Sequence, residues 1–480
     1  MNWALLADIF YILLIIAICL HIVYNTPSND KALAYVLITI FVPLIGIAIY
    51  FTLGVNRRKN KLYSKKIIRD KNTLAELRER ITLESEKALD TQEPAIKKHR
   101  KLALYLLKDG MSPLTGGNEV KLLINGENKF PEVLQSLRNA KHHIHIQYYI
   151  FEDGDIAEEI KNILIQKAQE GVAVRFIYDD FGSRSIRRSF VNEMKAAGID
   201  AFPFYKIHFI LLANRVNYRN HRKIIVIDGC IGFVGGINVS DRYVNKTGQT
   251  FWRDTHVKIS GPGVYYLQYL FISDWNFCAR KRLKLERNFF CTKPTEHGKA
   301  TVQIAASGPD SDVPTILFSM VQTIGLAEKE LLITTPYFIP GEAIMDALHV
   351  AAMSGVNIKI LVPDKSDSAF VNTAARSYYA DLLAVGVEIY LYQKGFVHAK
   401  TLVSDGQLAI IGTANMDHRS YELNFEVNSM IYDIATAKQL RDVFFEDIKQ
   451  AKKISPNTWK KRPYYKQLPE KLVRLLSPLL

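Results

Sequence analysis

The sequence predicts an α/β protein built from two similar halves that follow a membrane anchor. Two observations predict the halves: one motif occurs twice, at residues 221–238 and 398–415, and the segments preceding the two copies are also alike. A third observation, two long apolar runs near the start of the chain, predicts the anchor. Each half is expected to be an α/β sandwich with a largely parallel or mixed sheet.

Residues 1–56 are expected to form a two-helix transmembrane hairpin. The stretch from Ala32 to Leu53 has no charged side chain and is long enough to cross ~30 Å of hydrocarbon at ~1.5 Å per residue. An earlier apolar run, from Trp3 to Tyr24, is interrupted by Asp8 and His21. A cleaved signal peptide is disfavoured, because no basic segment precedes this run and a second run follows at once.

Charge after the apolar runs predicts the orientation of the chain. Residues 57–71 hold eight Lys and Arg against one Asp, and the loop between the two runs holds one Lys. The positive-inside rule therefore predicts that the start of the chain and everything after residue 57 lie in the cytoplasm. The region 57–110 is expected to be a basic juxtamembrane segment followed by a charged linker helix.

Composition agrees with this orientation but does not identify the partner. The cysteines are scattered without metal or redox spacing, which fits a reducing compartment. They are Cys19, Cys230, Cys278 and Cys291. The formal net charge of +14 fits attraction to anionic lipid headgroups, although nucleic-acid binding would give the same balance. No nucleic-acid-binding motif is found in the sequence.

The halves are expected at residues 111–295 and 296–455. Each is predicted to run strand, helix, strand, helix, strand and then the motif strand; GVAVRFIYDD in the first half matches GVNIKILVPD in the second. Tyr149 and Tyr337 end equivalent strands, and core packing is favoured for them over lining a cleft. The tail, 456–480, is amphipathic, and two alternatives stay open: a helix in the membrane interface, or a helix packed on the body.

The repeated motif fits H-x-K-x4-D-x6-G-[GT]-x-N in both copies. Residues i and i+2 of a strand share a face, so His221 is expected beside Lys223, and His398 beside Lys400. Imidazole is a competent nucleophile, and an ammonium group neutralises phosphoryl oxygens. The motif therefore suits attack on an anionic phosphorus atom.

The remaining fixed residues of the motif are expected to support this chemistry. Asp228 and Asp405 are each followed by glycine and lie an odd number of positions from their histidines. They are interpreted mainly as structural anchors at a turn, with a direct chemical role as the alternative. Asn238 and Asn415 are expected to donate hydrogen bonds to phosphoryl oxygens, together with backbone N–H groups near the glycines.

The duplicated motif resembles the HKD motif of the phospholipase D superfamily. The resemblance implies that the two copies meet at one site across a pseudo-two-fold axis, where one histidine becomes attached to the phosphoryl group and the other protonates the leaving alcohol. It favours His221 as the nucleophile and His398 as the acid. It also implies an orienting acid downstream of each motif: Asp254 for His221 and Glu426 for His398, with a surface salt bridge as the alternative.

Segments outside the motifs, among them VPLIGIAIYFTLG, FWRDTH, TTPYFIP and MDHRSYELNFE, make nearly the whole chain similar to the bacterial cardiolipin synthases. This resemblance implies phosphatidyl transfer between two phosphatidylglycerol molecules at the bacterial inner membrane. Anionic phospholipid is the expected partner, and neither nucleic acid, a cofactor nor a metal is expected. The alternatives are a phosphatidylserine synthase, a phospholipase D hydrolase, a membrane-anchored nuclease and an inactive scaffold.

Overall fold

The computed structural model describes residues 3–477 with gaps. The residues left out within this span are 27–28, 52–81, 84, 92, 111, 187, 205–217, 280, 292–294, 296–297 and 476. The basic run 57–71 lies outside the described residues, so the juxtamembrane segment expected there stays a prediction. Of the expected linker helix, the structure describes α5 (Pro94–Lys98) and α6 (Arg100–Gly110).

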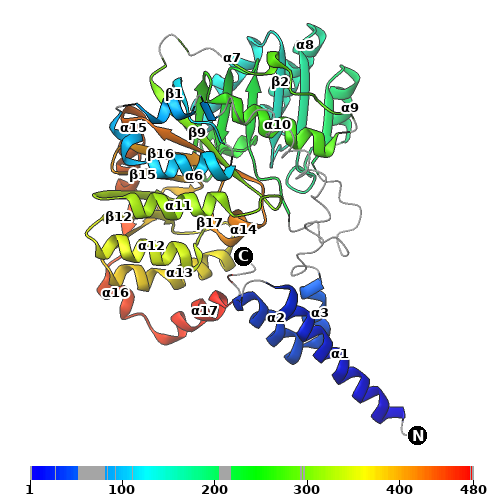
Figure 1. The fold of residues 1–480 in the computed structure, drawn as a ribbon, viewed down its shortest axis with the longest axis vertical. Helices are drawn as coiled ribbons and strands as arrows, with labels where there is room; N and C mark the ends of the chain where they lie inside the picture. Colours follow the sequence, from blue (N-terminus) through cyan, green and yellow to red (C-terminus); the bar gives the residue numbers. More distant parts are fainter. Residues whose placement is uncertain are drawn as a thin grey trace.

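One mixed, 15-stranded sheet runs through both halves of the molecule (Figure 1). The first half contributes β1 (Thr115–Ile124), β2 (His143–Tyr148), β3 (Ala173–Tyr178), β4 (Asp200–Pro203), β5 (Ile224–Ile227), β6 (Ile231–Gly235) and β8 (Thr255–Ser260). The second half contributes β9 (Ala300–Ser307), β10 (Glu330–Thr334), β12 (Asn357–Pro363), β13 (Glu388–Tyr392), β15 (Thr401–Ser404), β16 (Leu408–Gly412), β18 (Glu426–Tyr432) and β19 (Ala451–Lys453).

The strand order shows the pseudo-two-fold relation between the halves. The sheet is joined where β1 pairs antiparallel with β9. Outward from that pair, the order is β8, β6, β5, β2, β3, β4 on one side and β18, β16, β15, β10, β12, β13 on the other, with β19 added at the edge. Equivalent strands therefore lie at equal distances from the join, which confirms the α/β fold with two related halves.

Helices cover both faces of the sheet. In the first half they are α7 (Asn125–Arg138), α8 (Asp155–Gln169), α9 (Arg188–Ala196) and α10 (Val264–Cys278). In the second half they are α11 (Thr315–Leu326), α12 (Gly341–Met353), α13 (Ala369–Ala384), α14 (His418–Glu422) and α15 (Ile434–Lys449). Along β2, Ile144 and Ile146 pack in the core with α7–α9, while His145 contacts Gln268 of α10 on the other face. This alternation is the period-2 pattern of a strand.

A shared hydrophobic core joins the two halves. Val226 of β5, Val257 of β8 and Leu267 of α10 belong to the same buried cluster as Val403 of β15 and Phe444 of α15. Burial of apolar surface is the main favourable term in folding, so the two halves stabilise one another as one body. The site between them is consequently held by packed elements on both sides.

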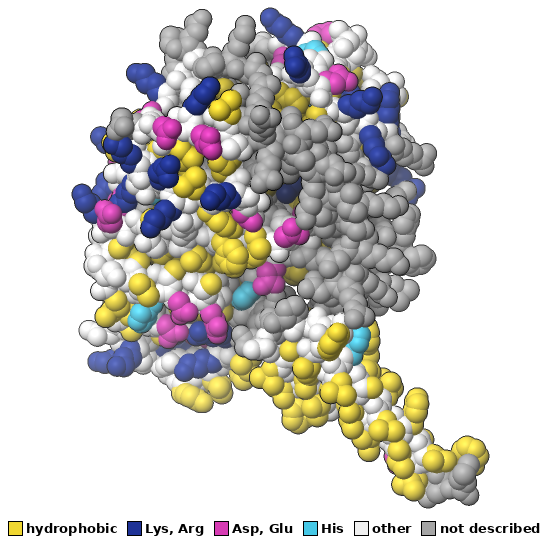
Figure 2. All heavy atoms as spheres, viewed as in Figure 1, with side chains coloured by type: hydrophobic (Ala, Val, Ile, Leu, Met, Phe, Trp, Pro, Cys, Tyr) yellow, Lys and Arg dark blue, Asp and Glu magenta, His cyan; other side chains and the backbone are white. Residues whose placement is uncertain are grey.

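The N-terminal region contains one helix of spanning length within the described residues, α1 (Trp3–Asn25). The second expected span is instead divided into α2 (Asn29–Phe41) and α3 (Pro43–Ile49). Pro43 lacks a backbone N–H and disfavours a helical conformation at Val42, where the break occurs. The expectation of one continuous helix over 32–53 is therefore not met. Figure 2 shows the side chains of this region as almost uniformly hydrophobic.

The two short helices fold back on each other. A Cβ atom added at Gly46 of α3 would lie 2.5 Å from the Cα of Thr39 in α2, so the absent side chain permits this close approach. The Tyr50 hydroxyl donates a hydrogen bond to the His21 carbonyl near the end of α1, over 3.4 Å. The end of α3 thus lies beside the end of α1, as Figure 1 also shows.

The tail contains α16 (Pro456–Lys460) and α17 (Tyr464–Arg474). Arg474 forms an ion pair with Asp381 of α13, and its guanidinium lies 4.4 Å from the centre of the Tyr378 ring. In the structure α17 packs on the body, and Leu472 and Leu475 stay exposed.

Cys230 and Cys291 form a disulfide, with a sequence separation of 61 residues. Their scattered spacing gave no indication of a pair. Disulfides persist mainly in oxidising compartments, so the cysteines no longer support the inference that the protein lies in a reducing compartment. Cys19 and Cys278 are free.

Candidate active site

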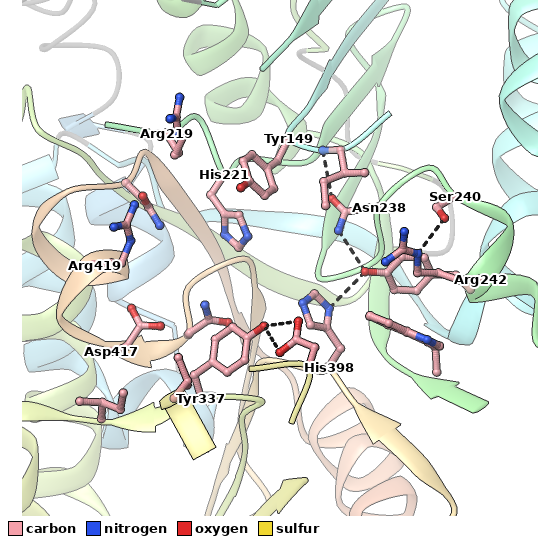
Figure 3. Close-up of a pocket in the computed structure, with 18 residues that line it drawn as sticks. Tyr149, Arg219, His221, Asn238, Ser240, Arg242, Tyr337, His398, Asp417 and Arg419 are labelled. Atoms are coloured by element: carbon pink, nitrogen blue, oxygen red, sulfur yellow. Dashed lines mark hydrogen bonds between the residues drawn. The ribbon is translucent and has the colours of Figure 1, made fainter. Parts of the chain in front are cut away.

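The two motif copies meet at one cavity of about 370 Å³ between the halves. His221 and Asn238 line it from the first half, and His398 and Asn415 from the second. Figure 3 shows both imidazoles turned toward this shared space. The structure therefore brings together four of the expected site residues from segments far apart in the sequence.

Each motif histidine lies on a segment that pairs with the other half of the molecule. The His221 N–H donates to the Phe425 carbonyl over 3.0 Å, and the Phe425 N–H donates to the Arg219 carbonyl over 2.8 Å. Likewise, the His398 N–H donates to the Arg253 carbonyl over 2.7 Å. Here β14 (Gly395–Val397) pairs in parallel with β7 (Phe251–Arg253). Each histidine is thus placed by backbone from the opposite half.

This exchange of segments crosses the histidine–carboxylate pairs. His221 Nδ1 lies 2.9 Å from Glu426, and His398 Nδ1 lies 2.7 Å from Asp254. The expectation that Asp254 supports His221 and Glu426 supports His398 is wrong. Glu426 directly follows Phe425, which pairs with the His221 segment. Asp254 directly follows Arg253, which pairs with the His398 segment. Each acid is therefore carried to the histidine of the opposite half.

The carboxylates set the protonation of the imidazoles. A carboxylate on Nδ1 fixes the tautomer and supports an imidazolium, as in a catalytic triad. Burial lowers the pKa of His398 to about 4, in spite of the charge of Asp254. Burial also lowers the pKa of His221, although Glu426 opposes the change. The lowered pKa values favour neutral imidazoles at neutral pH, and a neutral ring has a lone pair on Nε2 for attack.

The motif has glycine at position 236 in its first copy and threonine at the equivalent position, 413, in its second. The two acids explain this difference. A Cβ at Gly236 would lie 2.1 Å from Asp254 Oδ1, so only glycine leaves room for that carboxylate. At the equivalent position Thr413 donates a short hydrogen bond from its hydroxyl to Glu426. Each residue type thus fits the acid that it contacts.

The motif lysines lie buried beside the histidines. The Lys223 ammonium donates to the His221 carbonyl over 2.8 Å, and the Lys400 ammonium donates to the His398 carbonyl. Burial lowers the pKa of Lys223 to about 7 and the pKa of Lys400 to about 8. A phosphate group bound between them would favour their charged forms, because an opposite charge nearby stabilises the cation.

The motif aspartates lie outside the cavity. Asp228 accepts hydrogen bonds from the backbone N–H groups of residues 141–143, and Asp405 from those of residues 328–330. Both have positive φ angles, 51° and 52°, at the turn after the motif strand. The structure gives them the anchoring role, and no contact places them at the reacting groups.

Two tyrosines at the cavity have the role that was disfavoured for them, and two basic residues there were not expected at all. Tyr149 and Tyr337 line it rather than filling the core, and the Tyr149 ring centre lies 4.8 Å from that of His221. Arg219 and Arg419 also line it. Two signals point to them in the sequence: Arg219 precedes His221 by two positions, and Arg419 follows a motif asparagine by four, as Arg242 does in the first half.

In the described part of the chain, no group of three or more His, Cys, Asp and Glu side chains is arranged to hold a metal ion.

Comparison with known proteins agrees with this geometry. The family model described as "Cardiolipin synthase, PLD-like domain" matches residues 133–270 and 320–448. The cardiolipin synthase of Geobacillus sp. (strain WCH70) is 41% identical over 91% of this chain and 86% of its own length. Cardiolipin synthase 1 of Bacillus anthracis is 38% identical over 97% of this chain and 92% of its own length.

A solved structure shows the same fold at low sequence identity. The phosphatidylserine synthase of Haemophilus influenzae Rd KW20 superposes with a TM-score of 0.59 at 13% identity, covering 79% of this chain and all of that one. With both motif copies at one cavity and relatives aligned over nearly its full length, the chain belongs to the cardiolipin synthase family of phospholipase D-like proteins.

Proposed function

We propose that the protein transfers a phosphatidyl group from one phosphatidylglycerol molecule to another, giving cardiolipin and glycerol. One observation carries the proposal: two buried imidazoles, each held by a carboxylate through Nδ1, face one cavity from opposite halves. Two matched histidines suit a double displacement, in which one attacks and the other handles the proton. The relatives named cardiolipin synthase support the choice of substrate.

The reaction has two steps that mirror each other. In the first, Nε2 of one histidine attacks phosphorus and the bond from phosphorus to the headgroup glycerol breaks. The other histidine acts in its imidazolium form, which its carboxylate and the bound anionic phosphate favour, and it gives its Nε2 proton to the departing oxygen. In the second, the deprotonated histidine takes the proton from a hydroxyl of the acceptor phosphatidylglycerol. That oxygen forms a bond to phosphorus while the bond from phosphorus to nitrogen breaks. The first histidine is thereby released unchanged.

The chain itself supplies the groups that stabilise the phosphoryl oxygens. The ammonium groups of Lys223 and Lys400 and the amides of Asn238 and Asn415 flank the histidines, and such preorganised donors stabilise developing negative charge. We expect no metal or other cofactor to take part. All ten predicted site residues have a place in this mechanism, with Asp228 and Asp405 as anchors of the motif turns.

The proposed place of reaction is the cytoplasmic side of the bacterial inner membrane. The helix α1 is apolar along a span of 21 residues, which supports membrane attachment. The basic run 57–71 supports a cytoplasmic location for both halves under the positive-inside rule.

A product assay tests the function. Purified protein is incubated with phosphatidylglycerol vesicles, and lipid products are identified by mass spectrometry. Cardiolipin and glycerol in equal amounts are expected, and the His398→Ala variant serves as the inactive control. Phosphatidic acid as the sole lipid product would show a hydrolase, and phosphatidylserine formed when free serine is added as the acceptor would show a different acceptor. Either result without cardiolipin contradicts the proposal.

A further inference from the structure

The two ends of the cavity differ in charge although the halves are related. Arg219 lies two positions before His221, whereas Phe396 occupies the same place before His398. The ring centre of Phe396 lies 5.7 Å from that of His398, and that of Trp252 lies 5.7 Å from it as well. The end beside His398 is thus aromatic, and the end beside His221 is basic.

A second pair of arginines occupies equivalent positions in the two halves. Arg242 and Arg419 each follow a motif asparagine by four positions and line the cavity. Arg242 contacts both carboxylate oxygens of Glu152, each over 2.7 Å, so its charge is matched. On the other side, Arg219 and Arg419 line the same cavity. Burial lowers the pKa of Arg219, and the charge of Arg419 lowers it further.

Arg219 is the unusual member of this group. Its side chain is 4% exposed, its guanidinium lies 4.2 Å from the centre of the Phe181 ring, and it borders the cavity. Within the described part of the chain, its Nη2 atom has no hydrogen-bond partner. A buried donor without a partner is costly, which points to a ligand that supplies the missing acceptor.

The acidic groups at this end do not fill that role. Asp179 accepts hydrogen bonds from the N–H groups of Phe181, Gly182 and Asn220, and it attracts Arg219 without a hydrogen bond to it. Asp417 caps α14 by accepting from the Ser420 N–H. Glu426 is engaged by His221. Nη2 of Arg219 therefore remains suited to an anion. Arg219 and Arg419, on the His221 side of the cavity, are called the basic end.

We infer that the basic end binds the phosphate of the acceptor phospholipid. This inference rests on the proposed function and deepens it. The two phosphates of cardiolipin are joined through one glycerol, so the phosphate under attack and the acceptor's own phosphate must both fit this cavity. A guanidinium presents a planar fork that matches phosphate, and Nη2 of Arg219 gains its acceptor when the lipid binds.

The position of the subsite also assigns the two histidines. The attacking hydroxyl enters opposite the nucleophilic histidine, next to the histidine that removes its proton. An acceptor whose phosphate lies at Arg219 places its hydroxyl beside His221. His221 is then the acid and base, and His398 is the nucleophile, the reverse of the roles that the superfamily resemblance implies.

Two reactions of the same enzyme separate the subsite from the chemistry. Cardiolipin formation needs an acceptor with a phosphate, whereas exchange of isotopically labelled glycerol into phosphatidylglycerol uses an acceptor without one. Both pass through the same phosphatidyl-histidine. In Arg219→Gln, cardiolipin formation is expected to fall roughly tenfold or more relative to glycerol exchange, because a bidentate contact to phosphate is lost. Arg219→Lys, which retains the cation, is expected to recover part of the ratio.

Arg242→Gln is the matched control, since Arg242 is the pseudo-symmetric counterpart of Arg419 and is already paired with Glu152. Its ratio of the two reactions is expected to equal that of wild type. An unchanged ratio in both Arg219 variants, whether or not the rates fall, overturns the subsite. Absence of cardiolipin with wild-type protein instead overturns the proposed function itself. Mass spectrometry of quenched wild type is expected to find the adduct on His398, and an adduct on His221 overturns the assignment of roles.

Discussion

At the scale of single residues, each reacting imidazole depends on an acid from the opposite half. The Asp254 and Glu426 side chains are both fully buried, and each holds one Nδ1 atom. In Asp254→Asn and in Glu426→Gln, kcat for cardiolipin formation is expected to fall roughly 10²- to 10⁴-fold, because an amide no longer fixes the tautomer or supports the imidazolium. Steady-state kinetics measure the loss, and circular dichroism serves as the folding control. Wild-type kcat in either variant would contradict the pairing.

The lysine pKa values predict the alkaline limb of the pH profile. A lysine whose pKa is lowered to about 7 loses its charge as the pH rises through that value. Since the free enzyme needs cationic Lys223 to bind phosphate, kcat/KM is expected to decline above pH about 7. In Lys223→Arg the decline is expected at higher pH, with a lower maximum, because a guanidinium remains charged. A wild-type profile that stays flat past pH 8, where Lys400 also titrates, argues against this cause.

The sequence was sufficient for the motif residues because their relation is local. A period of two along a strand predicts His221 and Lys223 on one face. In the structure the Lys223 ammonium donates to the His221 carbonyl, although β5 begins only at Ile224. It could not pair Asp254 with His398, because that contact depends on β7 meeting β14 from the other half. Arg219 was missed for a related reason: its burial against Phe181 is set by a loop distant in sequence.

At the scale of elements, Asp228 and Asp405 anchor the turns that follow the motif strands. They lie outside the catalytic cavity. Asp228→Asn removes the charge of a carboxylate that accepts hydrogen bonds from the backbone N–H groups of residues 141–143. The expected cost is about 2–4 kcal/mol of folding free energy, because charged hydrogen bonds contribute about 1.5–3 kcal/mol each and an amide retains part of them. Differential scanning fluorimetry should show a lower melting temperature. The kcat of the folded protein, measured below that temperature, should stay close to the wild-type value. The exposed Asp442→Asn is the control, and a loss of kcat without loss of stability would give Asp228 a chemical role.

Most elements of the halves could be predicted, and the failures have physical causes. Alternating apolar strands and amphipathic helices have characteristic periods, which is why the α/β pattern was predictable. Hydropathy counts apolar length without regard to chain direction, so it predicted one helix over 32–53 where Pro43 and Gly46 produce two. Proximity of Cys230 to Cys291 arises from the fold, since both segments meet at the turn of Gly229.

At the scale of the whole molecule, the shared core and exchanged segments place a complete site within one chain. An equimolar mixture of His221→Ala and His398→Ala proteins is therefore expected to form no cardiolipin, because neither chain contains both imidazoles. Wild type mixed with either variant should retain the activity of its own fraction. Activity restored in the mixture of variants would mean that halves exchange between chains.

The fold-back of α3 onto α2 bears on the number of membrane crossings. Because the end of α3 returns beside the end of α1, we predict that α2 and α3 together enter the bilayer and leave on the side where they entered. Only α1 is then expected to cross, and a single crossing would put its first residues and the catalytic halves on opposite sides. With the halves on the proposed cytoplasmic side, the start of α1 is expected to face the exterior, contrary to the orientation expected from two spans.

Site-directed labelling of intact cells checks this parity. In a background with the native cysteines replaced, a cysteine in place of Trp3 is expected to react with a membrane-impermeant maleimide, whereas one in place of Lys101 is expected to react only after lysis. Protection of both positions in intact cells would restore an even number of crossings. With an odd number of crossings, the first residues of the chain lie outside the membrane while the proposed lipid chemistry takes place on its cytoplasmic side. Reagents that do not enter the cell can then reach this short segment.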